Sequence, residues 1–146
     1  MGLQEDIERW LTHEDLRFER VKNTENTFQI LAKRAGTSGI GIDFFEPKNQ
    51  PGVLVVGAVV TMKNSQTGRY LRFNDAEKER FHAKVKEYCT SIQAICRIIA
   101  EAGKQRIGVY VVLDGKDSIL QRDVFDAIDR VSEMHEKTLK FLMRTF

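Results

Sequence analysis

The stretch from Asn74 to Gly103 constrains the fold most, because its apolar residues recur at alternating intervals of four and three. Spacing of this kind keeps one stripe of an α-helix apolar. Asn74 is a good N-cap, and Glu77, three residues on, completes a capping-box pattern. Gly103 suits the left-handed residue that ends many helices. The pattern predicts one long helix over 74–103, with a stripe made by Phe81, Val85, Tyr88, Ile92, Ile95, Ile99 and Ala102.

Cys89 and Cys96 lie to one side of that stripe on a helical wheel, and they widen its apolar arc to about 160°. A stripe that rests on one sheet needs only about 100°. Either neighbouring helices of the same chain cover the excess, or a second protein chain does, as in helix-mediated dimers. We therefore expect a dimer or partner contact at Cys89, Cys96 and Ile98.

The two cysteines are seven residues apart on the predicted helix. That spacing separates them by about 10.5 Å along the helix axis, which is too far for a disulfide between them. Free cysteine usually behaves as a small core hydrophobe. The sequence therefore predicts two buried, reduced thiols.

Length, charge and hydrophobicity limit the kinds of protein that this chain can be. The chain has 146 residues, the size of a single domain that can bury a core. Its net charge of +2 arises from mixed signs in both halves, so neither half has the one-signed field of a nucleic-acid or membrane binder. No apolar run approaches ~20 residues, and the N-terminus does not resemble a signal peptide. We expect one domain over 1–146, in the cytoplasm, with no membrane association.

The remaining segments predict a sheet flanked by helices. Alternating apolar residues indicate strands before the long stretch, and residues 63–73 read as a polar crossing loop. Asp114-Gly115 is the strongest hairpin signal in the chain, with a last strand over 117–123 and a final helix capped by Asp123. The predicted order is α-ββββ-α-ββ-α, an α+β fold with a mostly antiparallel sheet and helices packed on one face. The expected segments are helix 3–14, strands 16–22, 28–32, 40–45, 53–62 and 107–113, and the final helix with its stripe at Val124, Ile128, Val131, His135, Leu139, Leu142 and Phe146.

No motif in the chain indicates catalysis, a metal or a cofactor. The three histidines have no spacing typical of a zinc site, and His135 is best interpreted as a core residue of the last helix. Capping and a solvated face explain the three aspartates at the start of that helix (Asp123, Asp126 and Asp129). We expect no cofactor and no catalytic residue.

Basic residues between 63 and 86 raise the alternative of a nucleic-acid-associated protein. Aromatic side chains interleaved with basic ones can stack on bases. Acidic residues interrupt the positive charge there, and counterion release needs a net positive surface, so this is the weaker hypothesis. The group comprises Lys63, Arg69, Tyr70, Arg72, Lys78, Arg80, Lys84 and Lys86, interrupted by Asp75, Glu77, Glu79 and Glu87.

The order of elements from Phe28 to Phe146 resembles the fold of class I type III secretion chaperones and related small bacterial regulators. The stretch from Val109 to Phe125, VYVVLDGKDSILQRDVF, also resembles a small uncharacterised archaeal protein family that has that fold. The resemblance implies a homodimer formed partly through the central helix, and a surface that binds another polypeptide. It supplies no catalytic motif.

The leading hypothesis from the sequence is a non-enzymatic protein-binding module, with its specific role open. The alternatives are a nucleic-acid-associated protein that uses residues 63–86, and an enzyme whose site is assembled from distant residues.

Overall fold

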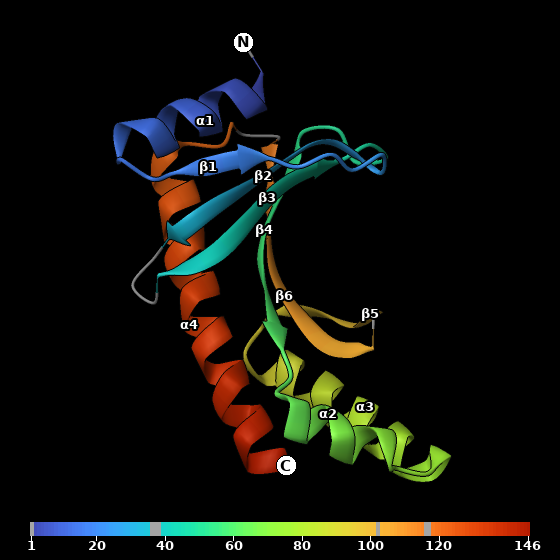
Figure 1. The fold of residues 1–146 in the computed structure, drawn as a ribbon. Helices are drawn as coiled ribbons and strands as arrows, with labels where there is room; N and C mark the ends of the chain where they lie inside the picture. Colours follow the sequence, from blue (N-terminus) through green and yellow to red (C-terminus); the bar gives the residue numbers. More distant parts are fainter. Residues whose placement is uncertain (1, 36–38, 102, 116–117) are drawn as a thin grey trace. The chain divides into compact units, whose positions relative to one another are not determined.

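The structure is a computed structural model that describes residues 2–35, 39–101, 103–115 and 118–146. Within these residues the chain forms four helices and six strands (Figure 1). The α+β class predicted from the sequence is confirmed, with one helix more than expected before the last two strands. The elements are α1 (Leu3–His13), β1 (Phe18–Arg20), β2 (Asn26–Ala35), β3 (Ile40–Pro47), β4 (Val53–Thr61), α2 (Asn64–Leu71), α3 (Asp75–Ser91), β5 (Ile95–Glu101), β6 (Lys104–Asp114) and α4 (Gln121–Thr145).

The six strands form one sheet in the order β1-β2-β3-β4-β6-β5. The pairs β1·β2, β2·β3 and β3·β4 are antiparallel. The described chain also divides into two compact units, which are treated separately below: unit 1 is Met1–Ala58 with Tyr110–Glu133, and unit 2 is Val59–Val109 with Met134–Phe146.

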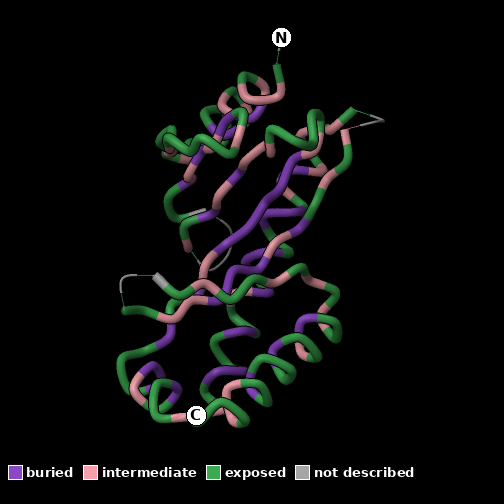
Figure 2. Tube along the Cα trace, turned by 90° about the vertical axis from the view of Figure 1, so that its right-hand side faces the viewer, coloured by how far each residue is buried: buried purple, intermediate pink, exposed green. Residues whose placement is uncertain are grey.

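The core of unit 1 is built on one face of its strands. Apolar side chains alternate along β2 and β3, so that Ile30, Ile42 and Phe44 are fully buried while the residues between them are not (Figure 2). This period of two is the one that the sequence predicts for a half-buried sheet. Figure 1 shows α1 and the first turns of α4 on the same side of these strands. The helices add Ile7, Leu11, Val124, Ala127, Ile128 and Val131 to the buried set.

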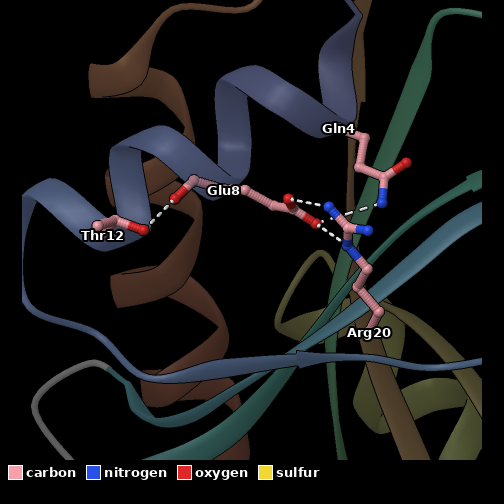
Figure 3. Close-up of polar contacts among 4 residues, drawn as sticks. All are labelled: Gln4, Glu8, Thr12 and Arg20. Carbon is pink, nitrogen blue, oxygen red and sulfur yellow. Dashed lines mark hydrogen bonds and ion pairs between the residues drawn. The ribbon is translucent and has the colours of Figure 1, made fainter.

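A bidentate ion pair joins α1 to β1 in unit 1 (Figure 3). The Nε and Nη2 groups of Arg20 each donate to a carboxylate oxygen of Glu8 at 2.8 Å, and Gln4 donates to the same carboxylate at 3.2 Å. The hydrogen bond from Arg20 is the main cause that holds the pKa of Glu8 below its usual range. Because Arg20 is largely exposed, we expect the pair to orient α1 more than to stabilise it.

The predicted single helix over 74–103 is wrong, although its start is correct. Asn74 Oδ1 accepts a hydrogen bond from the Glu77 N–H at 2.8 Å. In turn the Glu77 carboxylate accepts one from the Asn74 N–H at 3.1 Å. The helix ends at Ser91 in a Schellman motif. In that motif Gln93 has a φ of +55°, and the Ala94 N–H donates to the Cys89 carbonyl at 3.0 Å.

Two local effects explain why the helix stops there. The hydroxyl groups of Thr90 and Ser91 donate to backbone carbonyls of their own last turn, which competes with continuing the helix. Residues 95–100, Ile-Cys-Arg-Ile-Ile-Ala, which begin four positions after Ser91, are rich in β-branched side chains that favour strands. Gly103 does adopt a positive φ, +74°, but in the connection between β5 and β6 rather than at a helix end. Ala102 lies outside the described residues.

Three other expectations are corrected. The segment predicted as a crossing loop contains α2. Among the described residues no strand follows Asp114-Gly115 to complete the predicted hairpin. The Gly115 N–H donates to the Gly52 carbonyl at 2.9 Å, and a Cβ at Gly115 would overlap that oxygen, which explains the glycine. Residues 118–120 form no strand, while 116 and 117 lie outside the described residues. The last helix begins at Gln121, and Asp123 accepts from the Leu120 N–H at 3.0 Å.

In unit 2 the buried side of α4 agrees with the expected stripe at Leu142, which is 1% exposed, and differs from it at two other positions. Met134, Thr138 and Phe141 are buried, whereas His135 is half-buried and Leu139 is 39% exposed. His135 is therefore a residue of the core margin.

Burial lowers the pKa of His135. The folded state then resists protonation more than the unfolded state, so stability should fall as pH drops from about 6.5 through the folded pKa. We expect His135→Gln to reduce the pH dependence of the unfolding free energy between pH 7.5 and 5.5, measured by urea denaturation. His13→Gln, at an exposed position, is the control and should retain the wild-type slope. An unchanged slope in His135→Gln would contradict the assignment.

Candidate functional site

Strand β5 forms one edge of the sheet, and its sequence Ile-Cys-Arg-Ile-Ile-Ala-Glu is mostly apolar, with Arg97 as an exposed charged residue. Among the described strands it has a neighbour only on its β6 side. It is seven residues long, and its Ile95 and Ile98 side chains are 54% and 38% exposed. The opposite edge, β1, is only three residues long. Proteins usually shorten, charge or cover such edges, so a long apolar edge indicates a place where another chain pairs.

A groove of about 370 Å³ lies beside this edge, between α3 and β5 of unit 2. The α3 residues that line it are spaced one helical turn apart and so share one side of the helix. Cys96 and Ile98 alternate along β5 and so share one face of the strand. The lining consists of His82, Val85, Lys86, Cys89, Thr90, Ala94, Cys96 and Ile98.

Cys89 and Cys96 are joined by a disulfide, with their Cα atoms 6.1 Å apart. The predicted pair of reduced thiols is therefore wrong. The prediction failed because it assumed a continuous helix, whereas the chain reverses after Ser91 and returns along α3 as β5. The bond closes a loop of eight residues from the last turn of the helix to the start of the edge strand.

The structure brings together all three residues that the sequence analysis expected at a contact. Cys89 is 5% exposed, Cys96 is half-buried, and Ile98 is exposed. They meet because a strand folds back on a helix, and not because they share a helix flank. Ile98 is thus the surface residue of the three, and a substitution at Cys89 would disturb the interior.

The lining of the groove combines apolar side chains with one formally charged residue, Lys86. Val85 and Cys89 are buried, whereas His82 and Lys86 are exposed side chains of the lining. His82 Nε2 is hydrogen-bonded to the Tyr70 hydroxyl at 2.9 Å, which fixes the imidazole beside the groove. An apolar lining with the ammonium group of Lys86 at its side suits a partner segment that carries apolar and acidic side chains.

The opposite side of α3 is anchored within unit 2. The Tyr88 ring stacks on Phe141 of α4, with centroids 4.3 Å apart and planes at 18°. The Tyr88 hydroxyl is hydrogen-bonded to Thr138 Oγ1 at 3.1 Å, and burial raises the pKa of this phenol. The helix that forms one wall of the groove is held by these contacts, so we expect the groove to be preformed.

The basic segment 63–86 does not present its aromatic rings to solvent. Tyr70 is buried, packs edge-on against Phe73 and Phe81, and lies 5.5 Å from the Lys78 ammonium group. Stacking of bases needs an accessible ring face. These contacts occupy the rings on which the nucleic-acid alternative depends.

Comparisons with known proteins identify the family of this chain. A family model described as an uncharacterized conserved protein family, DUF2299, matches residues 3–142. The chain belongs to the DUF2299 family. Its fold is similar to the crystal structure of an uncharacterized protein from Methanothermobacter thermautotrophicus, with a TM-score of 0.74, 14% identity and 98% of each chain covered. At that identity the likeness concerns the fold alone. No functionally curated protein matches the chain.

The expected membership of a small uncharacterised family is thus confirmed, and the fold is shared with an archaeal protein. Neither comparison bears on the resemblance to secretion chaperones. In the described part of this DUF2299 protein, no helix is both long and apolar enough to cross a bilayer, and no three His, Cys, Asp or Glu side chains group as metal ligands.

The sequence predicted Val85 as part of a core stripe and Lys86 as part of the basic group of the nucleic-acid alternative, and it gave no role to Ala94, so the groove itself was not predicted. The available sequence signal is the isoleucines at 95, 98 and 99, because β-branched side chains favour strands.

Proposed function

We propose that this DUF2299 protein is a non-enzymatic protein-binding module, and that β5 with its adjoining groove is the docking site. The observation that carries the proposal is the seven-residue apolar edge with two exposed isoleucines beside an apolar groove. In the docked state an extended polypeptide adds a strand outside β5. Main-chain hydrogen bonds would give the affinity, and alternate side chains would enter the groove to give the specificity.

The residues at the groove indicate the kind of segment that would dock. Ile98 and the disulfide sulfurs favour a large apolar side chain in the groove. Lys86 favours a carboxylate next to it. The partner is therefore an extended segment in which apolar and acidic residues alternate.

A second copy of the chain is the other candidate for this edge. Two β5 strands can pair about a two-fold axis, which gives the same contact on both subunits. The resemblance to class I type III secretion chaperones also favours a homodimer and a bound polypeptide.

We place the protein in the cytoplasm. Reducing thiols there would exchange with the disulfide and open it.

Selection of extended peptides tests the proposal. Random 12-residue peptides displayed on phage would be selected on the wild-type protein, and synthetic versions would then be titrated against variants. We expect alternating apolar and acidic peptides, with affinity lowered at least tenfold by Ile95→Lys or Ile98→Lys, because a lysine at an edge strand opposes pairing. Leu71→Lys, at an exposed apolar position of α2, is the matched control and should bind like the wild type.

The mass of the protein in solution distinguishes a second copy of the chain at β5 from a peptide partner. If a dimer forms through β5, its mass should fall to that of one chain in Ile98→Lys and stay unchanged in Leu71→Lys. The proposal would fail if the selected peptides bound all four proteins equally and no β5 variant changed the mass.

A further inference from the structure

The edge strand β5 contributes no side chain to the buried core over residues 95–100. Two of these six side chains are half-buried and the other four are exposed. In the neighbouring strand β6, by contrast, Ile107, Val109 and Val111 are buried. A segment with few buried apolar contacts opens locally at a low cost in free energy. Core packing therefore holds β6 in place and does little to hold β5.

The disulfide supplies an anchor that side-chain packing does not. It joins Cys89, which is buried near the end of α3, to Cys96, the second residue of β5. The Ala94 N–H also donates to the Cys89 carbonyl at 3.0 Å, but this hydrogen bond lies before the strand begins. The disulfide is therefore the covalent tie between the start of the edge strand and the helix that forms the other wall of the groove.

The same disulfide can be reached by a small thiol. Both cysteines line the groove, and Cys96 is the more exposed of the two. A thiolate that enters the groove would bond to Cys96 Sγ, the Cys89–Cys96 bond would break, and Cys89 Sγ would leave as a thiolate. A second thiolate would then attack the mixed disulfide and release Cys96. The two protein cysteines are thereby reduced, and the two small thiols are oxidised to their disulfide.

We propose that this disulfide is a redox switch that controls docking at β5, with low-molecular-weight thiols as the reductant. The inference rests on the docking function proposed above. In the oxidised protein β5 is held against α3 and a partner binds, whereas in the reduced protein the edge strand opens and the partner leaves. The reverse exchange with a low-molecular-weight disulfide closes the bond again. Disulfides that form in the cytoplasm, where we place the protein, are usually catalytic or redox-sensing.

Binding and reduction must be coupled in both directions. If reduction weakens peptide binding tenfold, a bound peptide makes the disulfide tenfold harder to reduce, because the coupling free energy is shared by the two equilibria. For a two-electron couple, a tenfold change in the equilibrium constant corresponds to about 30 mV. The reduction potential of the disulfide should therefore fall by at least this amount when peptide saturates the site.

The experiment uses peptides selected on the oxidised protein, with reduced and oxidised glutathione as the redox probes. We expect affinity at least tenfold lower after reduction, and full recovery after reoxidation. Titration in glutathione buffers, with and without saturating peptide, measures the shift in reduction potential. The double variant Cys89→Ser and Cys96→Ser is the control: it should bind peptide like the reduced wild type, and its affinity should not respond to glutathione.

Amide hydrogen exchange gives a readout that needs no peptide. On reduction, the β5 amides that point toward β6 should exchange at least tenfold faster and accelerate more than the amides of β2. The switch is overturned if they accelerate no more than those of β2, or if millimolar reduced glutathione leaves the disulfide intact. Equal peptide binding in the two redox states overturns the switch alone. Binding in neither state overturns the docking function and the switch together.

Discussion

Replacing Phe141 by alanine is expected to lower the unfolding free energy by about 3–5 kcal/mol. The side chain is 7% exposed, and its ring stacks on Tyr88 of α3. Truncation would leave a cavity between α4 and α3 in unit 2 and remove the aromatic contact as well. Urea denaturation followed by circular dichroism measures the loss. Peptide binding at β5 should weaken in the same variant, because α3 forms one wall of the groove.

Leu139→Ala is the control for that experiment. Leu139 is on the same helix and was expected on its buried stripe, but it is 39% exposed in the structure. Its truncation should cost less than about 1 kcal/mol, as for most exposed positions. If Leu139→Ala lost as much stability as Phe141→Ala, the packed side of α4 would be the one expected from the sequence.

Removal of the disulfide by the double substitution Cys89→Ser and Cys96→Ser is expected to cost about 2.5 kcal/mol. The chain-entropy model gives this value for a closed loop of eight residues. The loss should be accompanied by weaker peptide binding, because the bond holds the start of β5 against α3 and both sulfurs line the groove. Thermal unfolding and the peptide titration measure the two effects.

Reduction is the complementary experiment. Dithiothreitol should lower the Tm of the wild type about as much as the double substitution does, and should leave the double variant unchanged. A wild-type sample that showed two free thiols before reduction, with no change in Tm on reduction, would contradict the disulfide.

The sequence predicted the fold class and the periodic strands because those depend on local pattern. The alternation of Ile30, Ile42 and Phe44 encodes one buried face directly, and Asn74 with Glu77 encodes a helix start. The end of α3 was missed because intervals of four and three also fit a helix break followed by an apolar strand. Gly115 was misassigned because its close approach to Gly52, 63 residues away, leaves no local signal.

The candidate site was predicted in part, for a partly mistaken reason. Cysteines at an interval of seven drew attention to the right residues, since they widened an apolar surface. Their pairing depends on the chain reversal after Ser91, which spacing alone cannot reveal.

Amide hydrogen exchange of β5 in complex with a selected peptide tests the central claim most directly. In the free protein, those amides of Ile95–Glu101 that point away from β6 should exchange fast, because nothing pairs with that edge. On binding they should become protected, while the amides of β1 at the opposite edge of the sheet keep their rates. Protection confined to other segments, with β5 still exchanging at its free rate, would contradict docking at this edge.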